Sequence, residues 1–431
     1  MPSTYAGPVH IHRSWRRPVV WAAIPLVLGA GRAIDSLGVA LPQVRGEYRV
    51  NLHELQWVGV SFLLAQAIIL IAAGRVGDRV GRRPVFMVGM VLVFLGSVAA
   101  AAAPANGWLV AARIVEGVGA GILVSGSFAI VRDNVSTEML GRAFGVWAMV
   151  AGVGGWVVGP VVYGALTNSS SWRWVMILNA ALAVVALVLT PQFIPGGRPP
   201  TIVRPSFRRL LRDQNYVAAS AVIALVLTIV GLLWFTMIFY LHTVHSLTPL
   251  DIGLVVLAFG VPAAVVPLFT GRLADRIGFR PPLLIGMGLI FISLVAVSIA
   301  ADAHHLAGTI VAVVVTGAGM GFVVPSLHAV AFRQVHVEDR SDASGLYLTM
   351  RLIGGAVGVV IATMMLESIS HTSKPALGVV AGYDTASAWI WRMAAVIALI
   401  AVVVVLAGIR TPGGKQAPAV LEDAREPIGT L

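Results

Sequence analysis

Ten residues between two apolar stretches carry the most informative pattern in the chain: Gly74-Arg75-Val76-Gly77-Asp78-Arg79-Val80-Gly81-Arg82-Arg83. The pattern returns 197 positions later as Gly271-Arg272-Leu273-Ala274-Asp275-Arg276-Ile277-Gly278. A plain basic loop would explain the arginines, but neither the acid nor the glycines, which permit tight turns and close helix approach. We therefore expect a gating loop at both sites, formed by Gly74, Asp78, Arg79, Gly81, Arg82 and Arg83 in the first copy and by Gly271, Asp275 and Arg276 in the second.

Two further matches show that the repeat extends over the chain. Gly117, Gly119 and Gly121 recur at 317, 319 and 321, and Gly154-Gly155 recurs at 354–355, both with an offset of 200. A solenoid of stacked helices would have a far shorter period. If each copy holds an even number of membrane helices, the copies run in parallel, and parallel repeats place a substrate site near the midplane between them.

About twelve apolar runs have the length of roughly 20 residues that a membrane helix needs. They lie near residues 18–42, 52–73, 84–103, 107–131, 142–166, 174–194, 215–241, 251–270, 281–300, 306–331, 344–366 and 388–409. The pattern predicts an all-α membrane protein with two pseudo-repeated bundles of six helices. We expect a tail at 1–17, a first bundle at 18–194, a basic linker at 195–214, a second bundle at 215–409 and a tail at 410–431.

Composition and charge agree with a membrane location. The chain is 58% hydrophobic and only 11% charged, about half the charge of a soluble domain, and it has no cysteine. With the N-terminus inside, 22 of the 30 Lys and Arg residues fall on cytoplasmic segments and five fall outside. This bias predicts an inner-membrane protein with both termini in the cytoplasm. Because the basic residues are spread over several segments, we expect no nucleic-acid partner.

The Gly74–Arg83 loop resembles the signature loop of the major facilitator superfamily, except that Pro84 replaces a last basic residue. The resemblance implies the major facilitator fold, alternating access and a monomer. The fourth predicted helix, Arg113 to Gly121, is similar to a family motif with Arg followed by Gln and Gly, and here Glu116 takes the Gln position.

The fifth predicted helix resembles the motif of the family's antiporters, through Gly155, Gly159, Pro160 and Gly164. Gly145 lies one residue early, and Tyr163 replaces a glycine. Close helix packing alone explains these glycines equally well. Trp172-Arg173-Trp174 and the run from Gly345 through Arg351 to Gly355 look like the drug–proton antiporter branch, whose members have fourteen helices rather than twelve.

Two acids stand well inside the predicted helices, Asp35 and Glu116, near two arginines, Arg32 and Arg113. A charge in the bilayer costs about 2.5–3.5 kcal/mol, so such residues usually face a bundle interior. Their estimated depths match crosswise, which predicts a proton-coupling network of Asp35 with Arg113 and Glu116 with Arg32. The alternative is that each arginine merely neutralises the acid three residues away on its own helix.

Possible substrate contacts are Arg351, on the eleventh predicted helix, and Trp234, Phe235, Phe239 and Tyr240, on the seventh. The aromatic side chains have an alternative place at the membrane interface.

We expect a secondary transporter that exports small amphipathic molecules in exchange for protons. Its partners would be the substrate, protons and the lipid bilayer. A metabolite importer or uniporter is the alternative on the same fold, and a non-transporting membrane receptor or regulator is the alternative of another class. The sequence shows no catalytic constellation, metal-ligand spacing or phosphate-cradling loop, so we expect neither an enzyme nor a cofactor.

Overall fold

The structure is a computed structural model, and it describes residues 37–134, 152–193, 207–333, 335 and 340–409. Over these residues the chain forms helices and no strands. In chain order the helices are η2 (Leu37–Ala40), α2 (Leu41–Tyr48), α3 (Leu52–Val80), α4 (Arg82–Ala101), α5 (Asn106–Asn134), η3 (Val153–Val158), α7 (Gly159–Ser169), α8 (Arg173–Phe193), α9 (Phe207–Leu210), α10 (Gln214–Thr243), α11 (Pro249–Val265), α12 (Pro267–Ile277), α13 (Arg280–Asp302), α14 (Leu306–Phe332) and α15 (Arg340–Gly408).

Ten segments of the described chain are long and apolar enough to cross a membrane. α11 and α12 together form one of them, and α15 contains two, Asp342–Ile369 and Val380–Gly408. Large apolar side chains on their outer faces are exposed, among them Ile68 at 79% and Val311 at 63%. Exposing so many apolar side chains on long helices is unfavourable in water but favourable in lipid.

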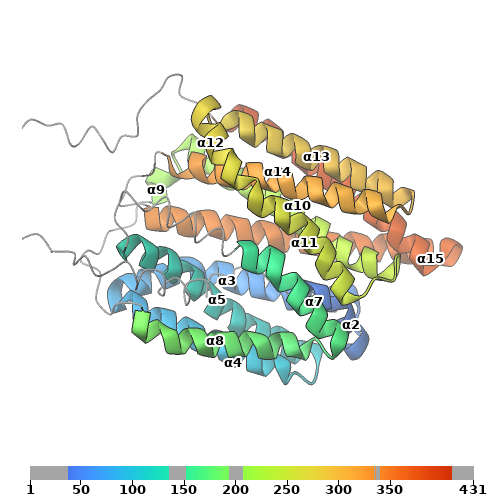
Figure 1. Ribbon diagram of the computed structural model, residues 1–431, viewed down its shortest axis with the longest axis horizontal. Coiled ribbons are helices and arrows are strands. Elements are labelled where there is room, and N and C mark those ends of the chain that lie inside the picture. Colours follow the sequence, from blue (N-terminus) through green and yellow to red (C-terminus); the bar gives the residue numbers. More distant parts are fainter. Residues whose placement is uncertain (1–36, 135–151, 194–206, 334, 336–339, 410–431) are drawn as a thin grey trace, which may run out of the picture.

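The helices form two groups that lie side by side in Figure 1. In the first group α5 packs between α3 and α4, and α8 packs on α4. In the second group α15 packs on α10 and α13, and α14 packs on α13 and α11. The groups meet where α3 contacts α15 and where α7 contacts α11. We call them the first and second halves below.

α3 continues through most of the motif that the sequence analysis placed in a loop. The predicted span of 52–73 is therefore too short, because the helix ends only at Val80. Gly81 follows with a φ of 112°, a backbone conformation that favours glycine. Gly278 occupies the corresponding place after α12 with a φ of 83°. These two turns are 197 residues apart, as the repeat predicts.

The glycine contacts reproduce the repeat at the level of single residues. A Cβ on Gly117 would collide with the carbonyl of Phe62, and a Cβ on Gly317 would collide with the carbonyl of Phe259. Gly119 likewise meets the carbonyl of Gly89, and its counterpart Gly319 meets the carbonyl of Gly286. Phe62 and Phe259, like Gly89 and Gly286, are 197 apart. Equivalent helices within each half therefore approach each other closely at equivalent glycines.

Candidate functional site

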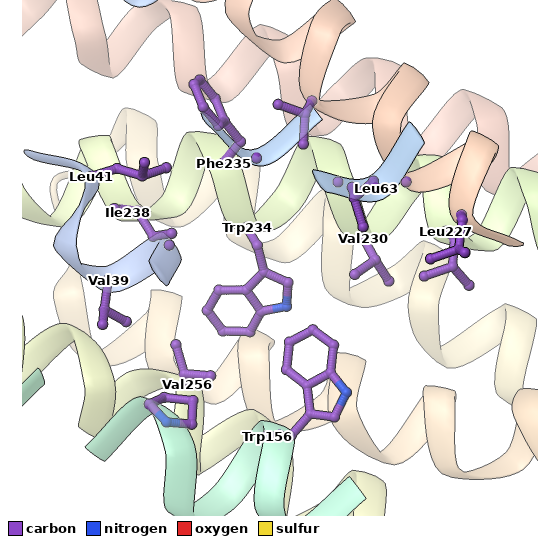
Figure 2. A pocket seen from close by; sticks show the side chains of 18 of the residues that line it. Val39, Leu41, Leu63, Trp156, Leu227, Val230, Trp234, Phe235, Ile238 and Val256 are labelled. Atoms are coloured by element: carbon purple, nitrogen blue, oxygen red, sulfur yellow. The ribbon is translucent and has the colours of Figure 1, made fainter. Parts of the chain in front are cut away.

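A cavity of about 190 Å³ lies between the two halves. Its walls come from η2, α2, α3, η3 and α7 of the first half and from α10, α11 and α15 of the second. Most of the side chains that line it are aliphatic or aromatic, as Figure 2 shows. Gln56 and Arg351 are the main polar members, and Arg351 is the one charged side chain of the lining. The cavity suits a small, largely apolar molecule.

Aromatic side chains from both halves meet in this cavity. The rings of Trp156 and Trp234 lie 6.1 Å apart, and each lies 5.2 Å from the ring of Phe259. Figure 2 shows the two tryptophans side by side within the cavity. Sequence reasoning had not identified Trp156, although it is the neighbour of Gly155 in the fifth-helix motif.

The four aromatic residues predicted on the seventh helix divide into two pairs. Trp234 and Phe235 line the cavity. Phe239 packs on Phe235 with ring centres 5.1 Å apart, and Tyr240 packs on Trp391, also at 5.1 Å. Neither Phe239 nor Tyr240 lines the cavity. All four are buried within the protein, so the alternative of a lipid-interface belt is wrong for this helix.

Arg113 and Glu116 form a buried ion pair on α5. Arg113 Nη1 lies 2.5 Å from Glu116 Oε2, and both residues are only 2% exposed. Arg113 also donates through Nε to the Val58 carbonyl at 3.2 Å and lies 4.1 Å above the ring of Phe62. The pair thus sits within the first half, against α3, and does not line the central cavity.

Two polar side chains on neighbouring helices complete the surroundings of Glu116. Ser97 Oγ on α4 donates to Glu116 Oε1 at 3.0 Å, and Asn179 Nδ2 on α8 donates to the same oxygen at 3.5 Å. Tyr163 on α7 in turn donates to Asn179 Oδ1 at 3.1 Å. Sequence reasoning missed Ser97 and Asn179. Asn179 stands alone in the apolar run of α8, and this isolation is a signal that could have found it.

The pairing of Arg113 with Glu116 is the alternative that the sequence analysis left open. The proposed partners on the first helix, Arg32 and Asp35, lie outside the described residues. The crosswise network of four residues therefore stays a prediction.

The repeated turn after α3 is linked to the second half by charged side chains. Asp78 forms an ion pair with Arg82, one helical turn away, and Arg82 also donates to the Gly74 carbonyl at 3.4 Å. Arg75 Nε lies 3.9 Å from Asp342 Oδ1 in the first turn of α15. A carboxylate there also suits the positive end of a helix. Sequence reasoning had not identified Asp342, because nothing local marks its distant partner.

The remaining arginines of the predicted gating loops are more exposed than Arg82. Arg79 and Arg276 are exposed, and Arg83 is half-buried. A Cβ on Gly271 would find open space, unlike one on Gly74, which would approach Ser125 Oγ at 3.1 Å. The side chain of Asp275 lies outside the described part of the chain. The two copies of the motif therefore share a backbone turn but differ in their surroundings.

The opposite end of the molecule also carries contacts between the halves. Arg45 Nη1 donates to Tyr383 Oη at 2.7 Å, and His53 Nε2 lies 3.3 Å from Glu367 Oε2. Contacts between the halves thus exist beyond both ends of the cavity.

The fifth-helix motif lies at the second contact between the halves. A Cβ on Gly164 would meet the Pro249 carbonyl at 2.5 Å, and one on Gly253 of α11 would collide with the Pro160 carbonyl. Gly155 lines the cavity, and Gly159 is buried beside Pro160. The segment before Gly159, η3, is a π-helix, a form that is frequent at functional sites.

Trp172 and Arg173, at the start of α8, make structural contacts within the first half. Trp172 Nε1 donates to Glu47 Oε2 at 2.7 Å, and Arg173 pairs with the same carboxylate at 2.5 Å. Arg173 also donates to the Ala103 carbonyl at 3.0 Å. The motif thereby ties α8 to α2 and to the end of α4.

The fold and the cavity between its halves define a membrane transporter, and comparison with known families agrees. The family model of the Major Facilitator Superfamily matches residues 23–359 and, in a second match, 220–430. The chain belongs to the Major Facilitator Superfamily. The predictions of an all-helical membrane protein of this fold, and of a transporter rather than an enzyme, are therefore confirmed.

Two similar proteins come from mycobacteria. The multidrug resistance protein Stp of Mycobacterium tuberculosis is 27% identical over 406 residues, which cover 80% of this chain and 75% of Stp. The multidrug efflux pump LfrA of Mycolicibacterium smegmatis is 27% identical over 419 residues, covering 83% of this chain and 81% of LfrA. Among solved structures, a D-xylose-proton symporter superposes with a TM-score of 0.73 at 16% identity, over 93% of this chain and all of that one.

Proposed function

We propose that this transporter exports small amphipathic molecules in exchange for protons, by alternating access. The observation that supports this most is the apolar, aromatic cavity between the halves, with contacts between the halves beyond both of its ends. A substrate can enter from either side if one set of contacts opens while the other stays closed. The similarity to Stp and LfrA, both named for multidrug resistance or efflux, supports export over import.

Glu116 is our proposed proton-coupling residue among the described ones. Protonation would remove its charge and free Arg113 from the ion pair. Arg113 contacts α3 through Val58 and Phe62, and α3 in turn contacts α15 of the other half. A physical route therefore runs from the carboxylate to the boundary between the halves. Asp35 and Arg32 would complete the network on the first helix.

The contact of Arg75 with Asp342 is our proposed gate at the Gly81 end of the cavity. Its charges lie on the two helices that must separate there, and the Asp78–Arg82 pair beside it fixes the end of α3. We further propose that this end faces the cytoplasm of a bacterial cell, with both termini on the same side, because the basic residues concentrate there. The family resemblance supports a monomer.

Everted membrane vesicles test this function. The vesicles are energised, lumenal pH is followed with a quenched dye, and cationic, neutral and anionic amphiphiles are added in turn. We expect at least one compound to drain the proton gradient with the intact chain but not with Asp35→Asn. If none does, and labelled compounds still equilibrate across the membrane, the protein is a uniporter or uses another ion. If both Asp35→Asn and Glu116→Gln keep full coupling, the network is wrong.

A further inference from the structure

The central cavity contains hydrogen-bond donors and a positive charge for which the described residues supply no acceptor and no counter-ion. The guanidinium of Arg351 carries five N–H donors and stays charged in proteins. Within the described chain Arg351 has no ion pair and no hydrogen bond, although it lines the cavity. Inside a membrane a cation without a counter-ion is costly, and it usually marks a substrate or ion pathway.

The carboxylates of the described part of α15 are Asp342, Glu367 and Asp384, and none of them pairs with Arg351. Asp342 lies nine residues before it, about 13 Å along the helix, and pairs with Arg75. Glu367 lies sixteen residues after it, about 24 Å away, and pairs with His53. Asp384 lies in the second span of α15 and pairs with His304. Glu116 is engaged by Arg113 inside the first half and does not line the cavity.

The titratable groups described near Arg351 carry no negative charge. Tyr347, one turn earlier on α15, and His328, on α14, are close enough to Arg351 to interact electrostatically. Their rings pack edge to face at 5.0 Å. His328 Nδ1 lies 2.8 Å from the Val324 carbonyl, so this nitrogen donates and carries the proton. Neither residue supplies a negative charge.

A second donor in the cavity also has no acceptor among the described residues. Trp234 Nε1 is buried and has no acceptor, although the indole lines the cavity beside Trp156 (Figure 2). An indole N–H usually finds a partner when it is buried. Gln56 Oε1 is the one lining acceptor left without a donor. The donors therefore outnumber the acceptors, and the excess includes a full positive charge.

We propose that the substrate is an aromatic amphiphile with an anionic group, such as a carboxylate, whose charge binds Arg351 and whose rings lie against Trp156 and Trp234. This proposal rests on the proposed function, because it assigns the substrate class of the same cavity. A planar guanidinium matches a carboxylate with two parallel hydrogen bonds. The adjacent indole faces supply an apolar, flat surface for the rings.

Calorimetric titration of the full chain in nanodiscs tests this proposal with three probes that share one ring system. The probes are 2-naphthoate, 2-naphthamide and 2-naphthylmethylammonium, which differ in charge. We expect the naphthoate to bind at least tenfold more tightly than either of the others. Arg351→Gln should remove this preference while leaving naphthamide binding in place, which shows that the variant is folded.

Further variants test separately the charge of Arg351, the planar geometry of its guanidinium and the N–H donor of Trp234. Arg351→Lys should keep part of the preference, because it retains the charge but loses the planar fork. Trp234→Phe should weaken naphthoate binding severalfold, since the ring stays and the N–H is lost. Arg333→Gln, on an exposed residue just after α14, is the matched control and should change nothing.

Three results would overturn the proposal: equal binding of the three probes, preference for the ammonium, or a preference that survives Arg351→Gln. Naphthoate binding that appears only in Asp35→Asn would also overturn it, because Asp35 would then be the fixed counter-ion of Arg351. Proton-linked flux of cationic compounds alone would leave the proposed function standing without the anionic substrate. Arg351-dependent naphthoate binding without any proton-linked flux would support the anionic substrate but contradict the proposed exchange for protons.

Discussion

At the scale of single residues, the carboxylate of Glu116 has the most polar contacts inside the first half: Arg113, Ser97 and Asn179 all bind it. Arg113, Glu116 and Arg351 stand out because each interrupts an apolar run. The partners of Glu116, Ser97 and Asn179, come from other helices and depend on how those helices pack. An uncharged Ser or Asn gives a weaker signal within an apolar helix than a charge does.

The buried pair on α5 gives a prediction for stability. Glu116→Gln leaves the Arg113 cation without its carboxylate, so we expect a loss of about 3 kcal/mol or more in the free energy of unfolding. The double variant Arg113→Gln/Glu116→Gln should lose less than the sum of the two single variants, because neither charge remains. Denaturant unfolding of the purified protein in detergent measures all three. Strict additivity would show that the two charges do not interact.

His245, between α10 and α11, gives a prediction for pH. Burial, and then the nearby His304, lower the pKa of His245 below its usual value of 6.5. The unfolded chain therefore binds more protons near this pH, and His245 costs the fold stability as pH falls from about 6.5 toward its folded pKa. His245→Gln should reduce the loss of melting temperature between pH 8 and pH 5. The exposed His242→Gln serves as the control, and an equal effect of both variants would contradict this account.

At the scale of elements, hydropathy predicted the membrane spans well and their ends less well. Ten of the twelve predicted spans match described helices, because a run of apolar residues is a strong signal in lipid. The other two, near 18–42 and 142–166, lie partly outside the described residues. α3 passes beyond its apolar run because the Asp78–Arg82 pair and the buried Gly77 allow polar residues to continue the helix to Val80. Hydropathy alone treats such residues as a loop.

The contact of α7 with α11 gives a prediction for packing. Gly253→Ala places a Cβ against the Pro160 carbonyl, so we expect a loss of about 1–3 kcal/mol in stability and a lower export rate. Gly288→Ala is the matched control, because a Cβ there meets nothing within 4 Å. Melting temperature and export rate in vesicles compare the two. A Gly253→Ala variant as stable and active as Gly288→Ala would show that this contact is not close.

At the scale of the whole molecule, the internal repeat was readable from the sequence, and the glycine contacts reproduce it in the structure. The contacts between the halves were not readable. Arg75 and Asp342, like His53 and Glu367, are far apart in sequence, and each is an ordinary surface charge in its local context. Only the packing of α3 against α15 brings them together.

The absence of cysteine allows a clean cross-linking test of how the halves move. A Cβ on Gly345 would lie 3.8 Å from Ile71 Cα and 3.3 Å from its Cγ1. Ile71→Cys with Gly345→Cys should therefore form a disulfide between the halves upon oxidation. We expect oxidation to stop export and reduction to restore it, while either single-cysteine variant is unaffected by oxidation. Full export by the cross-linked protein would mean that this end does not open.

The central claim is that a proton gradient drives uphill movement of an amphiphile through the cavity between the halves. The most direct measurement uses the purified chain in liposomes with an imposed pH gradient and an amphiphile that drains the gradient in everted vesicles. We predict that the amphiphile accumulates on the acidic side above its external concentration, and that a protonophore abolishes the accumulation. Equal concentrations on both sides, with or without the gradient, would contradict the claim and identify a uniporter.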